Sequence, residues 1–133
     1  MHKAHKALEN IYIGNYLDGQ EASEQGDLFV ICVSHLADNF ECNAFLPMVR
    51  YDAMLTQVLP SDLDIIATKI HSELLKGRRV FVHCGAGLER SPLAVVWFLH
   101  KYHNMSFDEA YTEVRKIRPL SLDRRGWISY SNL

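Results

Sequence analysis

Residues 79–103, RVFVHCGAGLERSPLAVVWFLHKYH, decide the fold and carry most of the reactive side chains. The apolar run Val80–Val82 is typical of a buried strand. The apolar segment Pro92–Tyr102 has the length of a helix. Between them lies a short loop that contains Gly85 and Gly87. The sequence therefore predicts a strand, a tight loop and the N-terminus of a helix, in that order.

A loop that leads into a helix N-terminus can bind an anion, because unpaired backbone N–H groups converge there with the positive end of the helix dipole. The same field favours the thiolate form of Cys84, and the thiolate is the nucleophile. Arg90 can grip two oxygens of a phosphate with its planar guanidinium. The stretch predicts a phosphate cradle with a nucleophile at its floor; a buried structural cysteine in a tight turn is the alternative.

The pattern His-Cys-x5-Arg-Ser in residues 83–91 resembles the signature of the cysteine-dependent protein tyrosine phosphatases. Residues 10–14 (NIYIG) resemble the opening strand of the dual-specificity members, and residues 105–118 resemble their penultimate helix. The resemblance is to a small, atypical dual-specificity phosphatase. It implies an α/β fold with a central, mostly parallel sheet of four to five strands flanked by helices, as the alternation of strands and helices also indicates.

The rest of the chain predicts a single domain over residues 1–133, with residues 1–8 as a loose N-terminal arm. Ser61 with Asp64, and Ser106 with Glu109, have the spacing of capping boxes. Further strands are expected at 28–33 and 44–51, helical turns within 18–26, and helices from Ser61 to Leu74, from Phe107 to Ile117 and over 123–130.

Hydrolysis through a thiophosphate intermediate assigns a role to each residue of the cradle. Cys84 is the nucleophile, and Ser91 can donate its hydroxyl to the departing thiolate, cap the helix, or do both. His83 organises the loop from the preceding strand. Gly85 and Gly87 can adopt positive φ, so that the backbone approaches the phosphate. The phosphoryl oxygens are held by the backbone of Gly85, Ala86, Gly87, Leu88, Glu89 and Arg90, and by the Arg90 guanidinium.

The resemblance implies a leaving-group acid, an Asp about thirty residues before the cysteine, between a strand and the next helix. Asp52 precedes Cys84 by 32 residues and follows the strand expected to end at Tyr51. The alternative for Asp52 is a solvated loop carboxylate. Asp62 and Asp64 are interpreted as charges at a helix start.

Glu89 departs from the small or neutral residue expected before the arginine. It can pair with a surface arginine or repel acidic substrates. A glutamate directly before the loop arginine also resembles the rhodanese-fold cell-cycle phosphatases, which offer a rival fold. Arg124 and Arg125 can hold a second phosphate or lie on a solvated helix face. In lipid-directed relatives a cysteine at the position of Cys32 forms a reversible disulfide with the nucleophile; core packing is the alternative.

Two further substrate classes differ in how well they fit the sequence. The loop contains no lysine, which disfavours phosphoinositides, whereas Arg118-Pro119 is similar to the sequence after this helix in cap-forming RNA triphosphatases. A non-catalytic phosphate-binding module and a rhodanese-like sulfur transferase are the rivals from other classes. The preferred function is hydrolysis of phosphotyrosine, with phosphoserine and phosphothreonine, in phosphoprotein substrates.

Composition limits the partners and the compartment. A net charge of −2 disfavours nucleic acid and anionic membranes, and no apolar run has the length of a membrane span. Three cysteines, an odd number without a disulfide framework, indicate a reducing, cytoplasmic setting. The expected protein is a monomer that needs no metal and no cofactor.

Overall fold

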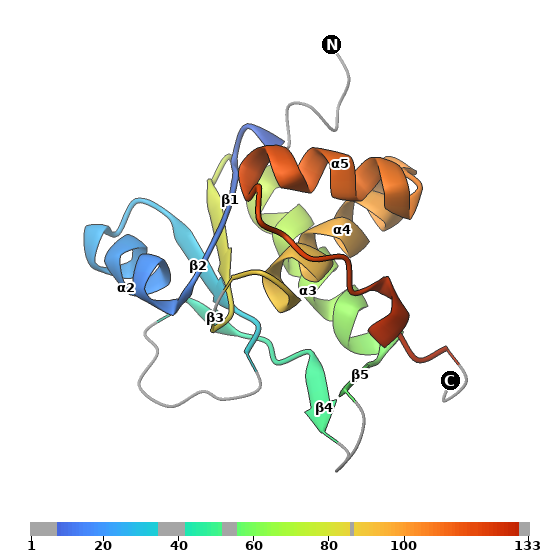
Figure 1. Ribbon diagram of the computed structural model, residues 1–133. Helices are drawn as coiled ribbons and strands as arrows, with labels where there is room; N and C mark the ends of the chain where they lie inside the picture. The colour runs from blue at the N-terminus through green and yellow to red at the C-terminus, as the bar shows by residue number, and fades with distance from the viewer. Residues whose placement is uncertain (1–7, 35–41, 52–55, 86, 131–133) are drawn as a thin grey trace.

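The computed structural model describes residues 8–34, 42–51, 56–85 and 87–130. Its middle layer is a four-stranded sheet in the order β1-β6-β2-β3, and every neighbouring pair of strands is parallel (Figure 1). The strands are β1 (Ile11–Gly14), β2 (Phe29–Cys32), β3 (Ala44–Phe45) and β6 (Val80–His83). The expected α/β fold with a parallel sheet is confirmed.

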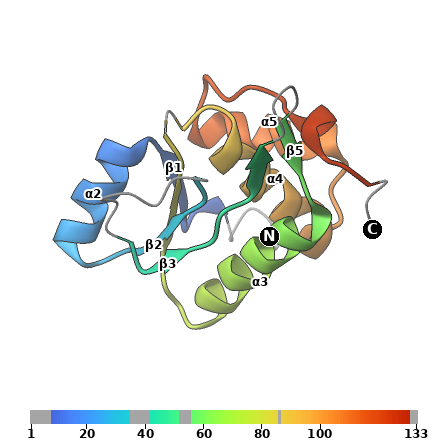
Figure 2. The ribbon, with the colours of Figure 1, turned by 90° about the horizontal axis from the view of Figure 1, so that it is seen from below.

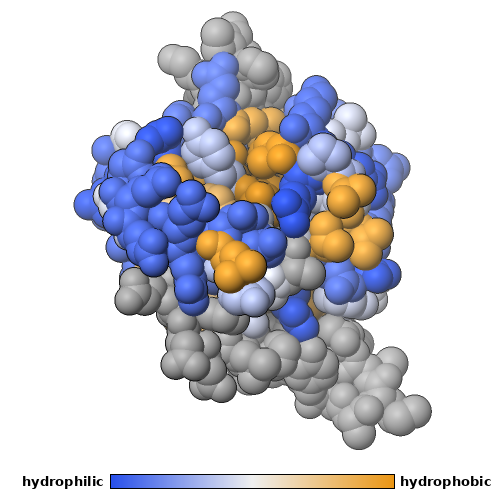
Figure 3. Space-filling view, turned by 60° about the vertical axis from the view of Figure 1, so that its left-hand side comes forward, coloured by the Kyte–Doolittle hydropathy of each residue, from blue (hydrophilic) through white to orange (hydrophobic). Residues whose placement is uncertain are grey.

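Helices cover both faces of this sheet (Figure 1). On one face lies α2 (Tyr16–Gln25), whose outer surface is largely hydrophilic with a few separate hydrophobic patches around it (Figure 3). The other face packs against the main hydrophobic core. Its helices are α3 (Pro60–Leu75), α4 (Arg90–His103) and α5 (Phe107–Ile117). None of the helices within the described ranges is long and apolar enough to cross a membrane.

Strand β6 is the central element because it pairs with β1 on one side and with β2 on the other. All four of its residues are buried, which explains the uninterrupted apolar run in the sequence. At its end, His83 is level with Gly14 of β1 and Cys32 of β2. The next residue, Cys84, therefore leaves the sheet at its carboxyl edge, where open parallel sheets place their ligands.

Two expected elements are wrong. Residues 44–51 form not one strand but β3 and a separate β4 (Val49–Tyr51), which pairs antiparallel with β5 (Thr56–Val58) (Figure 2). Pro47 lies between the two pieces and has no N–H for a sheet ladder. Residues 123–130 contain only a short 3-10 helix, η1 (Arg125–Trp127). There the Asp123 carboxylate accepts from the backbone N–H of Arg125 (3.1 Å), a local bond that competes with an α-helix.

The start of α3 also differs from the sequence-based expectation. The helix begins at Pro60, because proline suits the first turn of a helix. The N-cap residue is Leu59, which makes no side-chain cap bond. Ser61 is therefore not the cap. Asp64 does not serve the helix start either: it accepts from Trp97 Nε1 (2.8 Å) and pairs with Lys101 (3.0 Å), and so joins α3 to α4.

The two serines that the sequence proposes as caps provide a matched stability test. Ser106 Oγ accepts from the Glu109 N–H, and the Glu109 carboxylate accepts from the Ser106 N–H, both at 3.1 Å. Ser106→Ala should lower the free energy of unfolding by about 1 kcal/mol, the usual cost of losing an N-cap. Ser61→Ala should change it little. Urea unfolding measures both, and equal losses would contradict a start of α3 at Pro60.

Candidate active site

Cys84 lies at the floor of the loop that joins β6 to α4, and it is 2% exposed. Its Sγ accepts a hydrogen bond from the Gly87 N–H at 3.3 Å. The Ser91 hydroxyl lies 3.4 Å from the same sulfur. A thiolate in this place would be stabilised by both donors and by the positive end of α4.

The first turn of α4 contains the other two residues of the signature. Arg90 is the first residue of the helix and Ser91, fully buried, is the second. The N-cap is Glu89, which makes no side-chain cap bond. Ser91 is therefore not a helix cap, and its contact with Cys84 fits the alternative role, a hydroxyl that donates to the thiolate.

The backbone carbonyls of the loop are held by donors outside the loop. Because the C=O and N–H of one peptide point in opposite directions, an outward carbonyl turns the next N–H inward. This turns the N–H groups of Leu88 and Glu89 toward the loop interior. Of the three donors, only Arg118 belongs to a motif visible in the sequence. The bonds run from Tyr16 N to Gly85 O (3.0 Å), from Arg118 Nε to Gly87 O (3.2 Å) and from Leu122 N to Leu88 O (2.8 Å).

The two loop glycines have different roles. Gly87 has φ +74°, and a Cβ there would collide with the carbonyl of Gly14 and lie 2.8 Å from the nitrogen of Asn15. Gly85 is not among the glycines with positive φ, and a Cβ there would meet nothing within 4 Å. The expectation of positive φ is thus correct for Gly87 and wrong for Gly85.

His83 lies behind the loop, on the face of the sheet that α2 covers. Its ring packs against Gly19 of α2 so closely that a Cβ on that glycine would collide with the ring. Its Nδ1 lies 3.4 Å from the carbonyl oxygen of Cys84. Burial lowers the pKa of His83, although the bond to the Cys84 backbone opposes this change. A neutral, buried imidazole at this position can hold the loop through the Cys84 carbonyl.

Glu89 is paired with a surface arginine, one of the two alternatives that the sequence left open. Its carboxylate accepts from Arg124 Nε at 2.8 Å, and both side chains are about one third exposed. Arg125 turns away from the loop, to Asp123 (2.6 Å) and Asp108 (2.7 Å). Arg124 is therefore the one of the two arginines that lies beside the loop, with its charge balanced by Glu89.

Asp52 and Ala86 lie outside the described residues, so their roles stay predictions. The strands on either side of Asp52 are described: β4 ends at Tyr51 and β5 begins at Thr56. Strand β5 is held by the C-terminal segment, since Ser129 N–H donates to Val58 O at 2.9 Å. The segment after α5 thus contacts both the loop that follows β6 and strand β5.

Cys32 is fully buried on β2, next to the strand that leads to Cys84. Burial raises the pKa of its thiol to about 11, so the group is protonated at neutral pH. A disulfide with Cys84 stays a prediction. Among the described residues, no group of three or more His, Cys, Asp or Glu side chains could hold a metal ion.

Comparison with known proteins gives a family match. Residues 11–129 match the model of the dual specificity phosphatase catalytic domain. The chain is 28% identical to protein 123R of Invertebrate iridescent virus 6, over 92% of this chain and 85% of that protein. It is 39% identical to human dual specificity protein phosphatase 18 over 64 residues, which are 48% of this chain and 34% of that protein.

Two solved structures share the fold. The human tyrosine phosphatase-like serine/threonine/tyrosine-interacting protein superposes with a TM-score of 0.72 at 17% identity, over 91% of this chain and 87% of that one. PTPMT1 in complex with PI(5)P gives 0.68 at 20% identity, over 89% and 85%. At these identities the likeness shows the architecture alone.

Gly87→Ala tests the close approach of the loop to β1. Gly77 is a matched control, because it has a similar φ of +81° but a Cβ there would meet nothing within 4 Å. Gly77→Ala should cost about 1–2 kcal/mol in free energy of unfolding, from positive φ alone. Gly87→Ala should cost clearly more, since it adds the collision with Gly14. Equal costs in urea unfolding would show that the loop does not need this contact.

His83 should make stability depend on pH. Its pKa is lower in the folded state than the usual 6.5, so below pH 6.5 the unfolded chain binds more protons. The contribution of neutral His83 to the free energy of unfolding is therefore complete above pH 6.5 and is lost as the pH falls below it. Urea unfolding from pH 8 to 5.5 should show this loss, and His83→Gln should reduce it. An NMR titration of His83 with a midpoint at or above 6.5 would contradict the assignment.

Proposed function

The chain belongs to the dual specificity phosphatase family, and we propose that it hydrolyses phosphate monoesters through a phosphocysteine intermediate on Cys84. The observation that carries the proposal is the surroundings of the Cys84 sulfur. The Gly87 N–H donates to it, and the Ser91 hydroxyl lies 3.4 Å away, at the N-terminus of α4. A buried sulfur that only filled space would not need these donors.

In the first step, the Cys84 thiolate attacks phosphorus and the bond to the leaving oxygen breaks. Inward N–H groups of the loop and the Arg90 guanidinium stabilise the charge on the three phosphoryl oxygens. Asp52 gives its proton to the leaving oxygen. No metal enters either step.

In the second step, water attacks the phosphocysteine and the thiolate leaves. Asp52, now a carboxylate, takes a proton from the water. The Ser91 hydroxyl donates to the sulfur as negative charge returns to it. The second step therefore uses the contact between Ser91 and Cys84.

We propose phosphoproteins as substrates, with phosphotyrosine preferred and phosphoserine and phosphothreonine accepted. A phosphoinositide carries several phosphates, and the loop offers no lysine to hold them. Glu89 adds a negative charge and already occupies Arg124. RNA 5′-triphosphate and lipid phosphate, the latter suggested by the fold shared with PTPMT1, stay the two other candidates. We propose a monomeric enzyme of the cytoplasm, where thiols stay reduced.

The test is hydrolysis of p-nitrophenyl phosphate in the presence of EDTA, across pH. Cys84→Ser should lower kcat at least about a thousandfold, because no covalent intermediate forms. Asp52→Asn should lower kcat by about 10²–10⁴ and remove the acid-side limb of the profile. Phosphotyrosine peptide, PI(5)P and a 5′-triphosphorylated RNA, compared by kcat/KM, rank the three substrate classes.

Other results would redirect the assignment. An inactive wild type would favour a non-catalytic phosphate-binding module. Activity that is indifferent to Asp52→Asn would show that another group protonates the leaving oxygen, and Glu89, beside the loop, would be the next candidate. Activity lost with EDTA and restored by a divalent ion would contradict the metal-free mechanism.

A further inference from the structure

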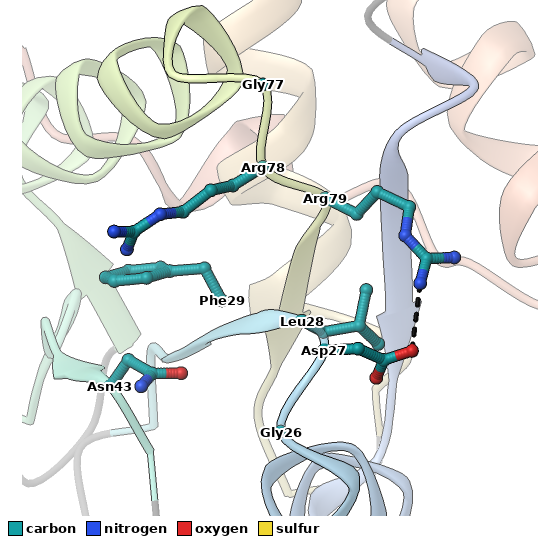
Figure 4. A pocket seen from close by; sticks show the side chains of 8 residues that line it. All are labelled: Gly26, Asp27, Leu28, Phe29, Asn43, Gly77, Arg78 and Arg79. Carbon is teal, nitrogen blue, oxygen red and sulfur yellow. Dashed lines mark hydrogen bonds and ion pairs between the residues drawn. The ribbon is translucent and has the colours of Figure 1, made fainter.

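A depression lies at the end of the sheet opposite to Cys84. Strand β6 begins just after Arg78 and Arg79, whereas Cys84 follows its other end. The depression has a volume of about 360 Å³. Figure 4 shows Arg78 extending over Phe29, Arg79 reaching the other way to Asp27, and the Asn43 side chain beside Phe29.

Two lysines lie beside residues that line this depression, Lys69 beside the Phe29 ring and Lys76 directly before Gly77, and with Arg78 they surround one buried carboxylate. The side chain of Glu73 is 1% exposed, and it pairs with Arg78 (2.9 Å), Lys76 (3.0 Å) and Lys69 (3.5 Å). One cation would neutralise this carboxylate. Burial alone would raise the pKa of Glu73, but Lys76, Arg78 and Lys69 together lower it, so the carboxylate stays charged.

The cations are also held in place by an aromatic ring. Lys69 Nζ lies 5.1 Å, and the Arg78 guanidinium 5.7 Å, from the centre of the Phe29 ring. Arg79 is balanced by Asp27 at 2.9 Å. Four cations and two carboxylates therefore leave an excess of two positive charges at this edge, in a chain whose net charge is −2.

The groups that line the depression suit a peptide. Asn43 Oδ1 accepts from the Val30 N–H at 2.7 Å, so its amide NH2 is the donor that remains for a ligand. Phe29 and Leu28 supply apolar surface between the charged groups. A concave, mostly polar site with two apolar side chains and basic groups around it fits a short chain with carboxylates, whereas a lipid surface would need a flat or convex face.

We propose that this depression, with the rim of Lys69, Lys76 and Arg78, is a basic groove that binds an acidic segment of the phosphoprotein substrate. Binding of the acidic segment does not depend on catalysis. Its effect on turnover rests on the proposed function. The expected consequence is a lower KM for a substrate that carries acidic residues at a distance from its phosphorylated residue, with kcat unchanged.

The first experiment measures binding alone, by fluorescence anisotropy of a labelled hexaglutamate peptide with the full chain. Lys69→Gln/Lys76→Gln should weaken binding by about tenfold, or about threefold for each surface charge pair lost. Arg78 still neutralises Glu73 in this variant. Lys116→Gln is a matched control, because Lys116 pairs with Glu113 three residues before it at 3.0 Å, the same spacing and distance as Lys76 with Glu73. Lys76→Arg keeps the charge and should retain binding.

The second experiment measures the effect on turnover. A phosphotyrosine peptide is joined to hexaglutamate by a Gly/Ser linker of about 20 residues, which spans roughly 25 Å on average. Lys69→Gln/Lys76→Gln should raise KM for this substrate several-fold. It should leave KM unchanged for the peptide without the tail and for p-nitrophenyl phosphate. If the wild type hydrolyses none of the three substrates, the proposed function fails while anisotropy still tests the groove.

Three results would overturn the groove. They are equal hexaglutamate affinity in wild type and Lys69→Gln/Lys76→Gln, an equal loss in Lys116→Gln, and binding to phosphatidylserine vesicles without binding to hexaglutamate. The last would assign the basic rim to a membrane. Urea unfolding of each variant shows whether a loss of affinity comes from unfolding. If a glutamine variant is unfolded, the affinity of Lys76→Arg for hexaglutamate shows whether the positive charge is needed.

Discussion

The site depends on where the carbonyl groups of the phosphate loop make their hydrogen bonds. A loop can turn N–H groups toward an anion only if its carbonyls are satisfied in the opposite direction. In this chain Gly85, Gly87 and Leu88 give their carbonyls to donors from three places: the start of α2, the end of α5 and the segment that follows α5. The cradle is therefore a property of the whole fold, although its residues are consecutive in sequence.

Close backbone contacts allow these bonds to form. Gly87 lies against the carbonyl of Gly14, at the point where β1 ends and α2 is about to begin. Gly19, one turn into α2, gives room to the His83 ring at the end of β6. These glycines bring α2 close to the loop, so that the Tyr16 N–H reaches Gly85. Larger residues at Gly14, Gly19 or Gly87 would push α2 away from β6 and from the loop that begins at Cys84.

Patterns within short stretches of sequence correctly predicted those elements that depend on interactions between neighbouring residues. The apolar run of β6, the apolar length of α4 and the capping box of Ser106 and Glu109 each depend on neighbours in sequence, and each is present. The donors Tyr16 and Leu122 were missed because they contact the loop across long sequence separations and only through backbone N–H groups, which carry no residue signature. The Asn15–Asp18 capping box directly after β1 was a usable signal for the start of α2. The division of 44–51 was also missed, since Pro47 can weaken a strand without showing which partner each half takes.

The distribution of charge explains why substrate choice should depend on surfaces outside the loop. In the proposed mechanism, backbone N–H groups and one arginine recognise any phosphate monoester, because they contact the phosphoryl oxygens and not the group that leaves. Beside the loop, Glu89 and Arg124 neutralise each other, so no net charge is added for a second acidic group. At the far edge of the sheet the balance is different, since three cations surround the single carboxylate of Glu73. If the loop binds phosphate as proposed, unbalanced positive charge at the opposite end of the sheet separates two tasks: the loop would perform the chemistry, and the distant edge would select which phosphorylated chain is held near it.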